Sequence, residues 1–162
     1  ISAGEILDLL REHLTSTLWQ TGDEKDAKDG MDMVLAIFDF KKLDLHFAAA
    51  YNPLILIRDD EVIVNKGDRM PVGYHPEKMP PFQTNTLKLK KGDCIYMSSD
   101  GYADQFGGPQ MKKFKYRQMK ELFVRIHGES MTQQQLLLNQ TIEEWKGSVQ
   151  QLDDILIVGR RF

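Results

Sequence analysis

The sequence predicts an α+β fold with largely antiparallel strand pairing. One amphipathic helical segment opens the chain, a series of short strand-like segments follows, and two further helical segments come after most of the strands. Strands and helices that are grouped in this way do not form alternating βαβ units, so a parallel sheet is not expected. No glycine pattern typical of a Rossmann or P-loop site occurs. With 162 residues, of which 41% are hydrophobic, the chain can form one domain around a sizeable core.

The first helix is predicted over Ala3 to Thr17. Ser2 stands where an N-cap residue is expected, and Glu5 follows three residues later, as in a capping box. Apolar residues then recur at helical spacing, which predicts that one face of the helix packs on the core.

Two β-hairpins are predicted next. The nearly continuous apolar run from Met31 to Phe40 predicts a central strand that is covered on both faces. Strict alternation over Leu43 to Phe47 predicts an antiparallel return. Leu54 to Ile57 and Val62 to Val64 flank a polar turn and predict the second hairpin.

An irregular loop and another pair of strands follow. Gly67 to Pro81 holds four of the six prolines, which excludes a regular helix or strand there. Phe82 to Leu89 alternates again, and the apolar run from Cys94 to Met97 predicts a buried strand.

The last part of the chain predicts two helices and a closing strand. Apolar residues at helical spacing predict helices over Phe114 to Ile126 and over Thr132 to Trp145. Ile155 to Val158 is an apolar strand directly after two aspartates.

Composition excludes several classes of function. The net charge of −3 and a pI near 5.8 give no basic surface for nucleic acid, and the longest apolar run is far shorter than the roughly 20 residues of a membrane-spanning helix. The single cysteine, Cys94, fits a reducing compartment. We therefore expect a cytoplasmic segment that contacts neither nucleic acid nor membrane. Because the chain begins with Ile1, we expect it to be part of a longer protein, which could itself be membrane-tethered.

Two aspartates lie at positions where they could serve as metal ligands. Asp100 follows the strand that begins at Cys94, and Asp153 precedes the last strand. Carboxylates fixed at the ends of strands are suitable ligands for hard cations such as Mg²⁺ and Mn²⁺, provided that the two strands are neighbours. The alternative interpretation is structural, because Asp-Gly after a strand is commonly a turn and paired aspartates before a strand are commonly solvated.

At these residues the sequence resembles a known family. Tyr96 to Asp104 resembles the strand and S/T-D-G motif of SpoIIE/RsbU-type phosphatases, which belong to the metal-dependent PPM, or 2C-like, superfamily. Gln151 to Val158 resembles the closing DD motif of that family. Further matches in the family's order are Asp29-Gly30-Met31-Asp32, Ala49-Ala50-Tyr51-Asn52-Pro53, Pro71-Val72-Gly73 and Asp104-Gln105-Phe106-Gly107-Gly108.

The resemblance implies a fold and a set of ligands. The fold would be a PPM-like αββα sandwich of two mostly antiparallel sheets flanked by helices. Asp100 and Asp153 match metal ligands, and Asp154 matches more weakly. The enzyme would use two Mg²⁺ or Mn²⁺ ions and no catalytic side chain beyond the metal-activated water. Leu156 stands where relatives commonly have threonine.

Two motifs of the family are missing. Neither its G-D strand nor its D-x-S/T-G-H-G segment occurs in the sequence. Residues 1–162 are therefore predicted to form a single, partial SpoIIE-type phosphatase domain without its N-terminal metal-binding motifs. Since both ions are needed to activate water and to bind the phosphoryl oxygens, we expect the isolated segment to be inactive or nearly so.

The implied function is hydrolysis of phosphoserine or phosphothreonine on a bacterial signalling protein. The resemblance suggests an anti-sigma-factor antagonist of the STAS type as substrate, and an upstream sensor or repeat module in the full-length chain. The alternative is a noncatalytic phosphatase-like module that transmits a sensor signal. Arg69, Lys112 and Lys113 are the candidate substrate-binding residues, although a solvated helix entry also explains the two lysines. Buried structural roles are expected for Cys94 and Trp145.

Overall fold

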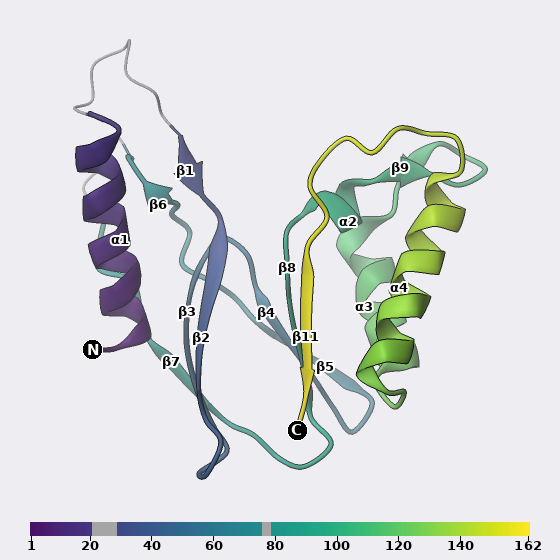
Figure 1. Cartoon of the computed structure of the whole chain (residues 1–162), viewed down its shortest axis with the longest axis horizontal. Helices are drawn as coiled ribbons and strands as arrows, with labels where there is room; N and C mark the ends of the chain where they lie inside the picture. The colour runs from purple at the N-terminus through teal and green to yellow at the C-terminus, as the bar shows by residue number, and fades with distance from the viewer. Residues whose placement is uncertain (21–28, 76–78) are drawn as a thin grey trace. The chain divides into compact units, whose positions relative to one another are not determined.

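The computed structural model describes residues 1–20, 29–75 and 79–162. These residues form two compact units, each of which is described by itself. The first unit comprises Ile1–Leu54 and Asn65–Lys90, and the second comprises Ile55–Val64 and Lys91–Phe162. Figure 1 shows that each unit combines strands with helices.

In the first unit, one helix packs against an antiparallel sheet. The helix is α1 (Ala3–Thr17), and the sheet has the order β2 (Met33–Asp39), β3 (Asp44–Ala50) and β7 (Asn85–Lys88). Ser2 caps α1 and forms a capping box with Glu5, as predicted. The core between helix and sheet contains small side chains of β3, which leave room for Leu7 of α1. The predicted hairpin is confirmed, since β2 pairs with β3 from Met33↔Ala50 to Asp39↔Asp44.

The prediction of a central position for the first strand was wrong. Among the described strands, β3 lies in the middle of this sheet and β2 at its edge. The side chains of β2 are all half-buried, whereas most of those of β3 are buried. An apolar run therefore did not distinguish a strand covered on two faces from an edge strand.

A second, two-stranded sheet of the first unit explains two of the glycine motifs. β1 (Gly30–Met31) pairs with β6 (Val72–Gly73), which interrupts the predicted irregular loop, and Gly30 lies opposite Gly73. A Cβ atom on Gly73 would lie 2.7 Å from the Cα atom of Gly30 and 2.8 Å from the carbonyl oxygen of Asp29. The close approach of two backbones thus requires glycine here. Residues 76–78 of the predicted loop lie outside the described residues.

The second unit contains a four-stranded sheet, covered by helices. Its order is β11 (Ile157–Arg161), β8 (Cys94–Ser98), β4 (Leu54–Arg58) and β5 (Glu61–Asn65), so the second predicted hairpin is confirmed. Between β8 and β11 the chain forms α2 (Gly101–Asp104), the pair β9 (Phe106–Gly107) and β10 (Lys112–Lys113), α3 (Lys115–Ile126) and α4 (Met131–Lys146). In Figure 1, α3 and α4 lie on the same side of β8 and β11. One apolar core joins these helices to the sheet.

The closing strand differs from its predicted range. It was expected over Ile155 to Val158, and β11 instead runs from Ile157 to Arg161. The ladder with β8 begins at Ile157↔Ser98, because the backbone of Leu156 bonds to Ser99 outside the regular ladder. The mixed α+β class with antiparallel sheets is confirmed.

A candidate cation-binding edge

The register of two neighbouring strands brings the predicted metal ligands to one edge of the sheet. β8 and β11 pair antiparallel, with Ser98 opposite Ile157. Asp100 lies two residues beyond the end of β8, and Asp153 lies four residues before the start of β11. In an antiparallel pair the end of one strand meets the beginning of its partner. The condition on which the sequence-based hypothesis depended, that these two strands are neighbours, is therefore met.

Backbone contacts show how near the two segments are. An ideal Cβ atom on Gly101, the residue after Asp100, would lie 2.4 Å from the carbonyl oxygen of Asp154 and 3.3 Å from that of Asp153. These distances leave no room for a side chain at position 101. The glycine of the Ser99-Asp100-Gly101 sequence is thus explained by the approach of the Asp153-Asp154 backbone.

Ser99 connects the same two segments through three hydrogen bonds. Its hydroxyl donates to the carbonyl oxygen of Asp154 at 2.7 Å and accepts from the backbone N–H of Leu156 at 3.0 Å. Its own backbone N–H donates to the carbonyl oxygen of Leu156 at 3.0 Å. Leu156 itself has no side-chain hydroxyl. In this chain a hydroxyl at position 99 supplies hydrogen bonds to that segment.

The two aspartate side chains face solvent. Asp100 and Asp153 are exposed, and the Asp100 carboxylate makes no capping hydrogen bond to α2. One carboxylate oxygen of Asp153, Oδ1, accepts from the backbone N–H of Asp154 at 2.7 Å. Within residues 1–20, 29–75 and 79–162, no lysine, arginine or histidine forms a salt bridge with Asp100 or Asp153. Their negative charge is therefore not offset by a cationic side chain of the described chain.

The carboxylate oxygens at this edge are suitable ligands for a hard divalent cation, but the described residues supply too few of them for a complete site. Exposed carboxylate oxygens are the ligands that Mg²⁺ and Mn²⁺ prefer. The part of the chain that the structure describes contains no group of three or more His, Cys, Asp or Glu side chains arranged to hold a metal ion. Asp100 and Asp153 could contribute ligands from two neighbouring segments, and Asp154 stays a weaker prediction. The remaining ligands would have to be water or groups outside these residues.

The segment from Asp104 to Gly108 supports this edge. The Gln105 side chain is 1% exposed, and its Nε2 atom donates to the carbonyl oxygens of Phe106 and Gln150. Gln150 lies in the loop that carries Asp153, so this side chain connects α2 to that loop. In Figure 1 the loop between α4 and β11 passes beside α2 and β9.

Trp145 explains the two glycines of the same segment. A Cβ atom on Gly107 would lie 1.9 Å from the carbonyl oxygen of Trp145, and a Cβ atom on Gly108, which has φ +66°, would lie 2.8 Å from the Trp145 ring. The indole Nε1 atom donates to the carbonyl oxygen of Gln105 at 3.1 Å. Trp145 was expected to be buried in the core, and its side chain is instead only partly buried and packs against the core.

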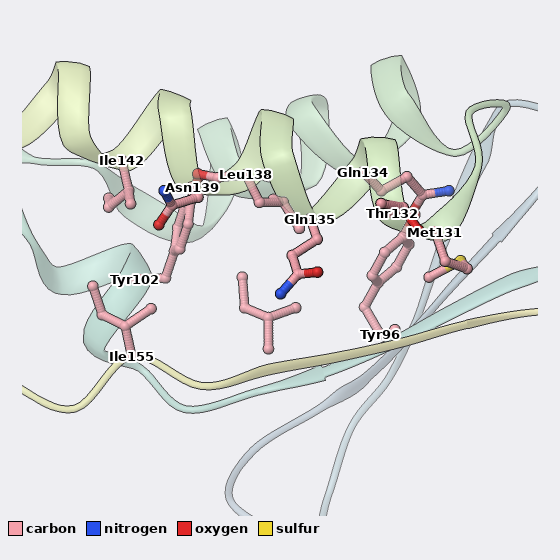
Figure 2. Close-up of a pocket in the computed structure, with 12 residues that line it drawn as sticks. Tyr96, Tyr102, Met131, Thr132, Gln134, Gln135, Leu138, Asn139, Ile142 and Ile155 are labelled. Atoms are coloured by element: carbon pink, nitrogen blue, oxygen red, sulfur yellow. The ribbon is translucent and has the colours of Figure 1, made fainter.

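A separate pocket lies between α4 and the β8–β11 pair. It has a volume of about 410 Å³, and none of its lining residues is charged. Figure 2 shows Gln135 and Asn139 of α4 facing Tyr102 and Ile155 across it. None of the three aspartates lines it. Since neither a cationic side chain nor a proposed metal ligand lines it, this pocket is not the candidate site.

Two buried tyrosines hold α4 above that pocket. The Tyr96 hydroxyl donates to Gln134 Oε1 at 2.7 Å, and the Tyr102 hydroxyl donates to the carbonyl oxygen of Leu138 at 2.8 Å. Burial raises the pKa of both phenols above the ordinary range. Both side chains therefore stay neutral hydrogen-bond donors, and they fix the helix rather than take part in proton transfer.

In the described part of the chain, no salt bridge joins the predicted substrate-binding residues to Asp100, Asp153 or Asp154. Lys113 pairs with Asp104 at 2.7 Å and both side chains are nearly half exposed, whereas Lys112 is exposed beside it on β10. Arg69 is exposed and belongs to the first unit. Cys94 is buried, and burial raises the pKa of its thiol, which agrees with the predicted structural role.

Sequence reasoning missed two polar residues that hold this edge, Ser99 and Gln105. Both lie inside segments that resemble motifs of the SpoIIE/RsbU-type family, so the motifs themselves could have pointed to these two residues. The hydrogen bonds that these two side chains make could not be predicted, because their partners lie 55 and 45 positions away in the sequence.

Comparison with solved structures defines the class of fold. The SiaA-PP2C domain of Pseudomonas aeruginosa matches with a TM-score of 0.88 and 26% identity, over 99% of this chain and 61% of that chain. The PP2C phosphatase domain of the cell fate determinant SpoIIE from Bacillus subtilis, with a fragment of its regulatory domain, matches with a TM-score of 0.68 and 22% identity, over 98% and 48%. A manganese-presoaked SpoIIE phosphatase domain of the same organism matches with a TM-score of 0.59 and 21% identity, over 97% and 70%. The chain therefore has the fold of PP2C-type phosphatase domains.

The family follows from the sequence itself. Residues 1–162 match the family of Stage II sporulation protein E (SpoIIE), and the chain belongs to this family. The chain spans 61% of the SiaA-PP2C domain and 48% of the SpoIIE chain that includes regulatory residues. No curated protein matches it. Among the described residues, no helix is both long and apolar enough to cross a membrane.

Proposed function

We propose that this chain forms the C-terminal part of a metal-dependent protein phosphatase domain that hydrolyses phosphoserine or phosphothreonine. The observation that carries the proposal is the antiparallel register of β8 and β11, with Asp100 and Asp153 next to the same edge. Membership of the SpoIIE family and the PP2C-type fold support the reaction class. The manganese-presoaked structure of a SpoIIE phosphatase domain supports Mn²⁺ as the ion, and Mg²⁺ is the alternative because it also prefers carboxylate oxygen ligands.

The chemistry of the proposed reaction assigns roles to this chain's own residues. Divalent cations at such an edge lower the pKa of bound water and offset the charge of a phosphoryl group. Asp100 and Asp153 would hold cations there through exposed carboxylate oxygens, and Asp154 would do so more weakly. Gly101 keeps the two segments close enough for this purpose. No side chain of the chain is proposed as nucleophile, and the buried Cys94 is not accessible for such a role.

The substrate is proposed to be a phosphorylated bacterial signalling protein of the STAS type, in a cytoplasmic pathway with an upstream sensor module. Lys112 and Lys113 are exposed or partly exposed on β10, and their positive charge would attract an acidic, phosphorylated surface. Arg69 is a further candidate for the same purpose.

The test uses the full-length protein that contains these residues. With Mn²⁺ and a phosphoserine peptide, we expect turnover that Asp100→Asn lowers by more than about 100-fold, since loss of a ligand should exceed the 10- to 100-fold effect typical of groups behind the ligands. Asp59→Asn is the matched control, because Asp59 is an exposed aspartate in the turn between β4 and β5. Circular dichroism should show the same folded structure for both variants.

The outcome that would contradict the proposal is Mn²⁺-dependent turnover that Asp100→Asn leaves unchanged. A full-length protein without any metal-dependent turnover would instead favour the noncatalytic signalling module. We expect residues 1–162 alone to hydrolyse the peptide poorly or not at all, since the described residues contain no three-ligand group.

A further inference from the structure

The hydroxyl of Ser99 uses its donor and its acceptor capacity on the same neighbouring segment. It donates to the carbonyl oxygen of Asp154 at 2.7 Å and accepts from the backbone N–H of Leu156 at 3.0 Å. A serine hydroxyl has one hydrogen to donate, and here that hydrogen goes to the residue next to Asp153. Ser99 itself is the residue before Asp100. One side chain thus connects the backbones next to both proposed ligands.

The segment from Asp153 to Leu156 makes few hydrogen bonds of its own, although its Ile155 side chain packs against the apolar core of the unit. It belongs to no helix or strand, and the regular ladder with β8 starts only at Ile157. The other hydrogen bonds of Asp153 within the described residues are local: Gln151 Nε2 donates to its carbonyl oxygen, and its Oδ1 atom accepts from the backbone N–H of Asp154. Among the residues that the structure describes, the long-range hydrogen bonds of this segment are therefore those to Ser99.

We propose that Ser99 is a positioning residue that sets the distance between the carboxylates of Asp100 and Asp153, and thereby the affinity of the edge for a divalent cation. This inference rests on the proposed function. Groups that orient ligands typically change metal affinity 10- to 100-fold when they are removed. The hydroxyl is required in this role, because an alanine would leave the Asp154 carbonyl and the Leu156 N–H without their protein partner.

A purely structural role of the hydroxyl is the competing interpretation. The bonds of Ser99 lie at a solvent-facing edge and not in the apolar core of the unit, whose members are contributed by β4, β8, α2, α3 and α4. Loss of the hydroxyl should therefore alter local geometry more than global stability. This difference between the two interpretations can be measured.

The experiment compares three serine variants of the full-length protein. Ser99→Ala removes the hydroxyl, Ser99→Thr keeps it, and Ser130→Ala makes the same chemical change at the N-cap of α4, where the hydroxyl accepts from the backbone N–H of Gln133. Mn²⁺ affinity is measured by calorimetry, the thermal midpoint by circular dichroism, and exchange of the Leu156 amide by hydrogen–deuterium exchange.

We expect Ser99→Ala to weaken Mn²⁺ binding about tenfold or more and to speed exchange of the Leu156 amide, and Ser99→Thr to restore both. Ser130→Ala should lower the thermal midpoint at least as much as Ser99→Ala, without change in Mn²⁺ affinity. Wild-type Mn²⁺ affinity in Ser99→Ala would overturn the positioning role while leaving the proposed function intact. Absence of Mn²⁺ binding by the wild-type protein would overturn both the positioning role and the proposed function. Faster exchange of the Leu156 amide in Ser99→Ala would then show only that Ser99 holds this segment in place.

Discussion

Strand β8 has an aspartate near each of its ends, and the surroundings of the two side chains differ. Asp93 directly precedes the strand, is 2% exposed, and accepts from Arg58 Nε at 2.9 Å and from Arg58 Nη2 at 2.6 Å. Asp100 follows the strand, is exposed, and forms no salt bridge with the described residues. In the sequence, both residues are aspartates beside an apolar strand. In the structure they differ, because Asp93 is buried and bonded to Arg58, whereas Asp100 is exposed.

This comparison indicates that the two aspartates have different roles, one in stability and the other in cation binding. A buried carboxylate is tolerated only with a partner that offsets its charge, and such a pair fixes the sheet. An exposed carboxylate without a cationic partner contributes little to stability and is available to an external cation. Changes at the Asp93 end should therefore affect unfolding, and changes at the Asp100 end should affect cation binding.

The largest effect on stability is expected for Arg58→Met. It removes the guanidinium that faces the buried Asp93 carboxylate, and we expect a loss of about 2–3 kcal/mol in the free energy of unfolding, somewhat below the range for a fully enclosed pair because the Arg58 side chain is 21% exposed. Urea unfolding measures this loss. The double variant Arg58→Met/Asp93→Leu should recover part of it. A single variant as stable as the wild type would show that the two ends of β8 do not differ as described.

An intermediate effect is expected for Gly101→Ala. The new Cβ atom would meet the carbonyl oxygen of Asp154 at 2.4 Å, so the segment carrying Asp153 must shift, at a cost of about 1–2 kcal/mol. Mn²⁺ affinity of the full-length protein should fall about tenfold, because the carboxylates then no longer lie at their native distance. Gly128→Ala is the matched control, since a Cβ atom there meets nothing within 4 Å. Equal Mn²⁺ affinity of both variants would contradict the close approach as a requirement for binding.

The smallest effect concerns the pH dependence of stability at the Asp93 end. Burial raises the pKa of the Cys94 thiol above its usual value of about 8.5, so the unfolded chain releases this proton at lower pH than the folded one. The contribution to stability is complete below about pH 8.5 and decreases as pH rises. We expect the free energy of unfolding to fall more steeply in the wild type than in Cys94→Val between about pH 8 and pH 9.5. Parallel curves for the two proteins would show that the thiol is not protected by burial.

Local patterns in the sequence predicted most elements of the fold. The capping box at Ser2 and Glu5 predicted where α1 begins, alternation predicted the return strand of the first hairpin, and β-rich runs on both sides of a polar turn predicted the second hairpin. Position within a sheet was not predictable in the same way. The run from Met33 to Phe38 is as apolar as a central strand, yet β2 lies at an edge among the described strands, because sheet order depends on long-range pairing.

The site shows the same division. Short motifs by themselves determined the residue types, Asp100 and Asp153 as carboxylates beside apolar strands, and the family to which the chain belongs. Only the tertiary structure decided that β8 and β11 are neighbours, that Gly101 approaches the Asp154 backbone, and that Ser99 binds a segment 55 positions away. The physical reason is that propensity and periodicity act over a few residues, whereas strand register and backbone hydrogen bonds between distant segments are fixed by packing of the whole unit.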